Sequence, residues 1–312
     1  VVTIGGGTGS FAVLKGLREY PYDITAVATM FDSGGSSGVL RDEHGVLPPG
    51  DVRRCLVALS EGWREETMRQ LFNYRFENGA ALRGHNFGNI LLTALSDILG
   101  NEAAAIEQAG MLLNIRGRVL PVSLESAHLC AELDDGTHIH GEGNIDIRKH
   151  AQEAAIKQVY LDPVPGAFEK VLEAIEQADV LILGPGDLYT SLVPNLLVNG
   201  VTEAIAKSDA RKFYVLNLFT KPGETDGYRA SDFAAAALRY STLSKFDGIV
   251  YNAADLPKEL VARYGQQGQE PVTIDEQLKE YADALHGAEL YSGDDVLRHD
   301  PKKLAQVIDD LI

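Results

Sequence analysis

The chain contains only two cysteines in 312 residues, and this scarcity excludes two classes of protein. Two cysteines cannot build a disulfide framework, and they are too few for a zinc cage of cysteines. Cys55 and Cys130 both lie in apolar runs, "CLVAL" and "HLCAEL". Unpaired cysteines in such surroundings behave as small core residues, so we expect both to be buried and reduced.

Positive charge is also scarce. The sequence has 28 Lys and Arg against 45 Asp and Glu, which gives a formal net charge of −17. A surface this acidic repels a polyphosphate backbone over long range, and we therefore expect no nucleic-acid partner. A small anionic ligand is compatible with this charge where backbone N–H groups and a few cations surround it.

Long hydrophobic runs are missing too, because no apolar stretch approaches the ~20 residues that span a bilayer. No basic segment followed by an apolar stretch stands at the start. We therefore expect a cytoplasmic protein that does not insert into membranes. The sequence also has no G-x-x-x-x-G-K, which argues against a P-loop NTPase.

The chain does contain a regular alternation of buried strands and amphipathic helices. "VVTIGG", a helix over residues 10–20 and "DITAVATMFD" form the start of a parallel βαβ unit. The pattern returns with "DVLILGPGD", "RKFYVLNL" and "FDGIVYN". We predict an α/β fold, with a Rossmann-like three-layer αβα core and a parallel sheet, as a single domain over 1–312. We also predict a β-rich insertion over about 115–162 and a mostly helical tail over about 253–312.

The opening stretch "VVTIGGGTGS" leads from a strand directly into a glycine loop. Glycines allow close backbone approach, and the helix that follows presents free N–H groups to an anion. Gly7-x-Gly9-x-x-Ala12 fits the permissive dinucleotide fingerprint, and Asp32 stands where an acid would bind the ribose. A tight strand-to-helix turn explains the same glycines, so both interpretations stay open.

Two further loops carry polar groups. "DSGGSSG" offers a second cradle of N–H and hydroxyl groups, and Asp32 in it is a candidate for a ribose hydroxyl or for Mg²⁺. In "LPPGDVRR", Asp51 is either the N-cap of the next helix or a site residue. Arg53 and Arg54 oppose the helix dipole, which favours a functional role, and Arg41 is another candidate phosphate partner. An ordinary flexible loop is the alternative for "DSGGSSG".

Three later loops complete the set. "GHNFGN" presents His85, Asn86 and Asn89, although the two asparagines are also candidate helix caps. "GPGDLYTSLVPN" and "NLFTKPGETDGY" each follow a buried strand. Parallel strands end at one edge of their sheet, so we expect these glycine-bearing loops to converge on a ligand site.

Taken together, these stretches resemble the YvcK/GlmR family, the gluconeogenesis factors, within the CofD-like fold. The matching pieces, in order, are "GGGTGS", "DSGGSSGVLRDEHGVLPPGDVRRCLVAL", "GHNFGN", "RGRVLP", "GPGDLYTSLVPNLLV" and "PGETDGY". The resemblance implies a bacterial regulatory protein that binds UDP-sugars, UDP-N-acetylglucosamine above all. It also implies a role in carbon partitioning into peptidoglycan precursors and in cell shape, with glucosamine-6-phosphate synthase as a regulated partner. We further expect a homo-oligomer.

One departure from the family pattern concerns a metal. Members of the family carry two adjacent acids before the Gly-Gly-Ser-Ser run, whereas this chain has Asp32-Ser33. The loss weakens the case for Mg²⁺, which the more distant CofD relatives use in phospholactyl transfer. A nucleotide-dependent transferase therefore remains the second hypothesis, and an NAD(P)-dependent oxidoreductase the third.

The resulting prediction is a set of ligand-binding residues with no assigned catalytic group. They are Gly6, Gly7, Thr8, Gly9, Ser10, Asp32, Gly35, Ser36, Ser37, Arg41, Asp51, Arg53, His85, Asn86, Asn89, Gly184, Gly186, Leu188, Tyr189, Thr190 and Asn217.

Overall fold

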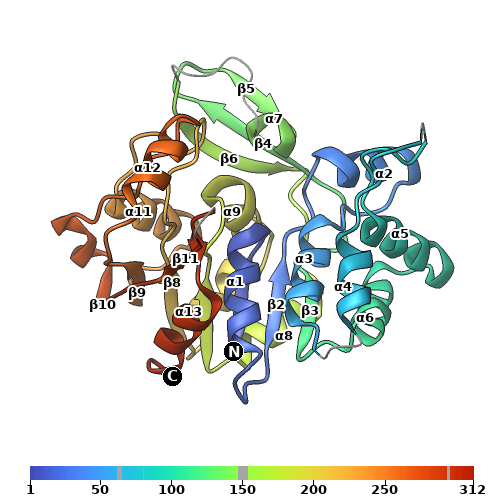
Figure 1. Cartoon of the computed structure of the whole chain (residues 1–312), viewed down its shortest axis with the longest axis horizontal. Coiled ribbons are helices and arrows are strands. Elements are labelled where there is room, and N and C mark those ends of the chain that lie inside the picture. Colours follow the sequence, from blue (N-terminus) through green and yellow to red (C-terminus); the bar gives the residue numbers. More distant parts are fainter. Residues whose placement is uncertain (62–64, 80, 147–153, 294–295) are drawn as a thin grey trace.

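A computed structural model describes the chain except for residues 62–64, 80, 147–153 and 294–295, and the side chains of 42–44 and 65. Seven parallel strands form the main sheet of this described part, in the order β10-β9-β8-β7-β1-β2-β3. Helices cover both faces of the sheet, which confirms the three-layer α/β prediction (Figure 1). The strands are β1 (Val2–Gly5), β2 (Thr25–Ala28), β3 (Arg118–Pro121), β7 (Val180–Leu183), β8 (Arg211–Val215), β9 (Phe246–Asn252) and β10 (Ala282–Ala288).

The strands are apolar on both sides because both faces of the sheet are buried. In β7, Leu181 and Leu183 join one hydrophobic core, while Val180 and Ile182 join the core on the opposite face. The first core contains residues of α8 (Glu169–Glu176), α9 (Val193–Leu196), α10 (Val201–Lys207) and α11 (Ala230–Ser241). The second contains residues of α1 (Gly7–Leu17), α3 (Gly50–Leu59), α5 (Phe87–Leu99), α6 (Glu102–Leu112) and α13 (Pro301–Asp309). The helices α2 (Gly35–His44), α4 (Glu65–Asn73) and α12 (Lys258–Gly265) complete the periphery.

The strand order reverses between β1 and β7. From β1 the chain proceeds to β2 and β3 on one side, and it later fills the other side with β7, β8, β9 and β10. In open α/β sheets, ligands bind at the carboxyl ends of the strands beside such a reversal. The glycine loops that follow β1 and β7 therefore flank the expected crevice.

A small antiparallel sheet lies beyond the carboxyl ends of the main strands, at the top of Figure 1. Its order is β5-β4-β6, with β4 (His128–Leu133), β5 (His138–His140) and β6 (Ile156–Asp162). The short helix α7 (Glu142–Asp146) follows β5. Inward-facing Leu129, Ala131 and Leu133 of β4 belong to the main core, so this sheet packs on the domain.

Two predicted boundaries need correction. Strand β3, which the sequence pattern placed in the insertion, pairs in parallel with β2 and belongs to the main sheet. The segment 253–312 is mixed and not mostly helical: β10 extends the main sheet beside β9, and β11 (Tyr291–Ser292) pairs with β12 (Arg298–His299). The side chains of β10, "ADALHGA", alternate between buried or half-buried and exposed because this strand forms the edge of the sheet.

Two other expectations concern burial and membranes. Cys55 and Cys130 are both unpaired and buried, as predicted. Among the described helices, none is both long enough and apolar enough to cross a bilayer.

Gly9 joins α1 to the loop after β7 through direct backbone contact. A Cβ atom at Gly9 would lie 2.2 Å from the carbonyl oxygen of Pro185. We expect Gly9→Ala to lower the free energy of unfolding by at least about 2 kcal/mol, because two backbone segments must separate. The control is Gly265→Ala at the end of α12, where a Cβ meets nothing within 4 Å. Equal urea midpoints for the two variants would contradict this account.

Candidate functional site

Two adjoining cavities lie at the carboxyl edge of the main sheet, in the described part of the chain. The larger has a volume of about 670 Å³ and is bounded by the starts of α1, α2 and α3, by α7 and by the loop after β7. The smaller, of about 170 Å³, continues towards the loop after β8 and strand β12. Gly7, Thr8, Asp187 and Lys221 line both cavities, so together they form one cleft at the strand reversal.

The structure brings most of the predicted residues to this cleft. The larger cavity is lined by the predicted Gly7, Thr8, Asp32, Gly35, Ser36, Ser37, Asp51, Arg53, Asn89 and Thr190. The smaller is lined by the predicted Gly7, Thr8, Gly9, Gly186 and Asn217. The other predicted residues line neither cavity: they are Gly6, Ser10, Arg41, His85, Asn86, Gly184, Leu188 and Tyr189.

Several residues of this last group support the wall from behind. Asn86 caps α5 by accepting a hydrogen bond from the Asn89 N–H at 3.2 Å, and its own N–H donates to the Ser36 hydroxyl at 3.1 Å. His85 Nδ1 lies 3.3 Å from the same hydroxyl. The hydroxyl of Tyr189 meets that of Tyr228 at 2.8 Å inside the core. These contacts give His85, Asn86 and Tyr189 positioning roles beside the cleft.

Asp51 binds the N-terminus of α1 and does not cap its own helix, which was one of the two interpretations of this residue. Its Oδ1 accepts a hydrogen bond from the Gly7 N–H at 2.9 Å and lies 3.2 Å from the Arg54 guanidinium. Gly6 leaves room for this carboxylate, because a Cβ there would lie 2.2 Å from Asp51 Oδ2. Burial raises the pKa of Asp51 to about 6, against the opposing effect of Arg54.

This arrangement decides between the two interpretations of the opening glycines. Gly6 accommodates Asp51 and Gly9 accommodates Pro185, so both glycines serve contacts within the protein. In a dinucleotide fingerprint the first glycine makes the tight turn and the second lets the backbone approach a pyrophosphate; here the Gly7 N–H binds a carboxylate and Gly9 packs against Pro185. The tight-turn interpretation therefore explains Gly6 and Gly9, while Gly7 and Thr8 still face the cleft.

Arg53 is held inside the wall, and Arg54 is the accessible cation of the pair. Arg53 Nε donates to Asn89 Oδ1 at 2.9 Å and its Nη1 donates to Asn73 Oδ1 at 2.8 Å. Burial lowers the pKa of Arg53 to about 10. The Arg54 side chain is 45% exposed, so it can turn towards an anion more readily than Arg53 can.

Asp32 meets an acid that sequence reasoning missed. Its Oδ1 accepts a hydrogen bond from the Gly34 N–H at 2.7 Å, and the Glu142 side chain of α7 hydrogen-bonds with it. Burial, followed by the Asp32 charge, raises the pKa of Glu142 well above its ordinary value, which favours the protonated form of Glu142 beside Asp32. Ser33, the residue that departs from the family pattern, accepts from the Gly143 N–H at 2.8 Å.

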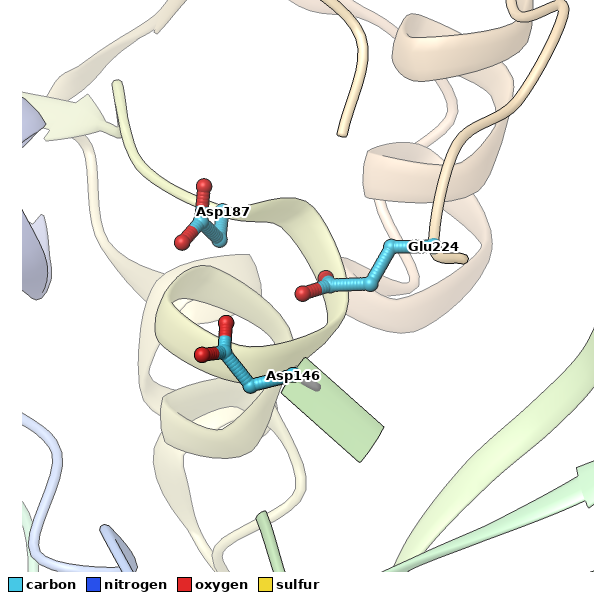
Figure 2. Close-up of side chains that lie close together, drawn as sticks. All are labelled: Asp146, Asp187 and Glu224. Carbon is cyan, nitrogen blue, oxygen red and sulfur yellow. The ribbon is translucent and has the colours of Figure 1, made fainter. Parts of the chain in front are cut away.

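Three carboxylates surround one ammonium where the two cavities meet. The side chains of Asp146, Asp187 and Glu224 point towards one another in Figure 2, with ligand oxygens all within 4.8 Å. Lys221 Nζ contacts Asp146, lies 2.6 Å from Asp187 and lies 3.5 Å from Glu224. Three such oxygens would suit a hard cation, and the lysine ammonium supplies that charge here.

The missed residues differ in the signal they gave. Lys221 lies in "NLFTKPGETDGY", a loop expected to reach the site, and its position after a buried strand is the signal that could have identified it. Glu142 and Asp146 reach the cleft only through the packing of the small sheet, and nothing local in the sequence marks them.

The raised pKa of Asp51 predicts a pH-dependent difference between the protein and Asp51→Asn. Between pH 4 and 6 the folded protein holds a proton that the unfolded chain has released, so stability falls as pH rises. The shift corresponds to about 3 kcal/mol at most, and an amide at this position does not titrate. Urea unfolding should therefore show the variant gaining stability relative to wild type from pH 4 to 7. A difference that stays constant with pH would refute this, and exposed Asp283→Asn is the control.

Removing the central ammonium should convert the carboxylate cluster into a cation site. We expect Lys221→Met to be destabilised in low salt, because three acids then face one another without compensation. Millimolar MgCl₂ should raise the Tm of this variant more than that of wild type. Lys245→Met, which removes an exposed lysine 3.9 Å from Asp283, serves as the control. Equal MgCl₂ effects on all three proteins would contradict the expectation.

Comparison with known proteins places the chain in a family. The sequence model of the family described as 2-phospho-L-lactate transferase CofD matches residues 1–289. The chain is 44% identical over 311 residues to the gluconeogenesis factor of Halalkalibacterium halodurans, covering 99% of this chain and 95% of that protein. It is 39% identical over 319 residues to the gluconeogenesis factor of Bacillus subtilis, covering 100% and 98%.

A solved structure agrees. The crystal structure of a UPF0052 family member from Bacillus halodurans superposes with a TM-score of 0.93 at 43% identity, covering 98% of this chain and 97% of that one. Identity at this level over nearly the whole length confirms the resemblance drawn from the sequence motifs. The chain belongs to the gluconeogenesis factor family and carries its CofD-type α/β domain.

Proposed function

We propose that this protein is a regulatory protein that binds a UDP-sugar, with UDP-N-acetylglucosamine as the preferred ligand. The observation that carries the proposal is the cleft of two joined cavities at the strand reversal, where a two-part ligand fits better than a compact one. The assignment of uridine and of the sugar rests on the family resemblance. The support from the structure is the size, polarity and position of the cleft.

The charges of the cleft support a diphosphate between the two cavities. The polar Thr8 lines both cavities, as does the cation Lys221. The cations Arg54 and Arg75 line the larger cavity, and Arg298 lines the smaller. Five carboxyl groups line the larger cavity beside these cations, so an anion would bind by competing with those acids for the cations. They are Asp32, Asp51, Glu142, Asp146 and Asp187. The diphosphate would lie near Thr8, with the nucleoside and the sugar on either side.

Magnesium is not part of this proposal, because the residues present fit it poorly. Asp32 accepts from Gly34 and Glu142, and Ser33 replaces the second acid of the family pattern. Asp51 is bound by Gly7 and Arg54. We therefore propose that binding needs no divalent cation.

The biological role we propose follows the family. A cytoplasmic sensor of a UDP-sugar would adjust carbon partitioning into peptidoglycan precursors and thereby affect cell shape. Such a sensor acts through protein partners, and glucosamine-6-phosphate synthase is the candidate that the resemblance supplies. A homo-oligomer remains our prediction.

A binding panel tests the proposal. Thermal shift and calorimetry with UDP-N-acetylglucosamine, GDP, NAD and NADP, each with and without MgCl₂, should give a response to the UDP-sugar alone that MgCl₂ does not change. Asp32→Ala should weaken that binding at least about tenfold by removing an acceptor from the cavity wall. Exposed Asp283→Ala is the matched control. No response to any UDP-sugar at millimolar concentration would end the proposal.

A CofD-like transferase is the second candidate. The family description and the acids Asp32, Asp51 and Glu142 beside the cleft favour it. A MgCl₂-dependent response to GDP in the same panel would support the transferase. An NAD(P)-dependent oxidoreductase is less favoured, because Asp51 holds the amide of the dinucleotide fingerprint.

A further inference from the structure

The outer face of the small sheet collects side chains that bind transition metals. Strand β4 turns Leu129, Ala131 and Leu133 into the core, so its alternate residues His128, Cys130 and Glu132 lie on the opposite face. Strand β5 adds His138 and His140 to that face. Three of the eight histidines of the chain therefore lie on two neighbouring short strands.

The strand register brings His128, Cys130 and His140 together with Asp162 of β6. Cys130 pairs directly with His140 of β5 and with Tyr160 of β6, and His128 pairs with Asp162. The rings of His128 and His140 have centroids 4.6 Å apart and an interplanar angle of 42°. Cys130 and His128 are two residues apart on one strand, so both side chains face the ring of His140.

The chemistry of this set differs from that of the cleft. Carboxylate oxygens suit hard cations, whereas imidazole nitrogen and thiolate sulfur favour Zn²⁺ and similar ions. We propose that His128, Cys130 and His140 form a binding site for a zinc-class transition-metal ion, with Asp162 as the fourth ligand.

Metal binding at this face requires a modest rearrangement. Among the described residues, the group of three ligand atoms that lie within 4.8 Å of one another is the carboxylate cluster of the cleft. The ligand atoms of His128, Cys130 and His140 do not yet lie that close together. His140 and Asp162 are exposed and can rotate, while Cys130 is buried and its thiol contacts the His128 carbonyl oxygen at 3.8 Å. The proposal is independent of the UDP-sugar.

A bound ion would also act on the cleft wall. His140 ends β5, and Glu142 and Asp146 follow it in α7, where both line the larger cavity. An ion that joins β4 to the end of β5 would restrain the start of α7. The site is therefore placed to couple metal occupancy to the rigidity of that wall.

Co²⁺ is a suitable probe because its absorption spectrum reports ligand type and geometry. The full chain without a histidine tag should bind one Co²⁺, with tetrahedral d–d bands and a thiolate-to-metal charge-transfer band that Zn²⁺ abolishes. His128→Gln and His140→Gln should each weaken Co²⁺ binding at least about tenfold, and Cys130→Ser should remove the charge-transfer band. His286→Gln, on β10 of the main sheet, should behave as wild type.

Three outcomes would overturn the proposal: no Co²⁺ binding, Co²⁺ binding without a thiolate band, or an affinity unchanged in both histidine variants. Because Cys130 is buried, Cys130→Ser is interpreted only if its circular dichroism matches wild type. The exposed His140→Gln variant keeps the test decisive if Cys130→Ser fails to fold.

Discussion

The hydrogen bond from the Gly7 N–H to the Asp51 carboxylate joins the start of α1 to the start of α3. Burying a carboxylate without hydrogen-bond donors would be costly. Asp51 finds its donors in the Gly7 N–H of α1 and in Arg54 of α3, and it therefore holds the two helix starts together. Gly6 can have no side chain because Asp51 occupies that space, and Gly9 can have none because Pro185 does. The start of α1 is thereby held against the start of α3 and against the loop after β7, and these contacts fix one wall of the cleft.

Charges in the cleft are arranged in pairs before any ligand binds. Asp51 is matched by Arg54, Asp32 by a protonated Glu142, and the three-carboxylate cluster by Lys221. These contacts lower the negative charge at this edge without cancelling it, because three carboxylates share the one Lys221 ammonium. An incoming diphosphate would compete with carboxylates for Arg54 and Lys221, so affinity depends on how readily these ion pairs exchange. Because the carboxylates compete with a ligand for these cations, only a ligand that makes enough other contacts in the cleft binds tightly.

The parallel sheet and the meeting of its loops could be predicted from the sequence, because both follow from local patterns. Continuous apolar runs indicate strands buried on two faces, and the runs of β1, β2, β7 and β8 each lead into a glycine-bearing loop at the same sheet edge. The edge strand β10 was missed because its side chains alternate between buried or half-buried and exposed, and β3 was misplaced because its short apolar run directly precedes the strands of the small sheet. Glu142 and Asp146 could not be predicted, since their place in the cleft depends on how a distant antiparallel sheet packs on the core.

The small sheet connects two chemically distinct regions of the molecule. Its inner face supplies Leu129 and Ala131 to the core, and α7 supplies Glu142 to the cleft. The Lys221 contacts with Asp146 and Asp187 tie α7 to the loop after β7. A ligand that draws Lys221 away would release α7 on one side, while the strand end at His140 holds it on the other. The position of α7 is therefore set by the Lys221 ion pair with Asp146 on one side and by the chain's link to β5 on the other.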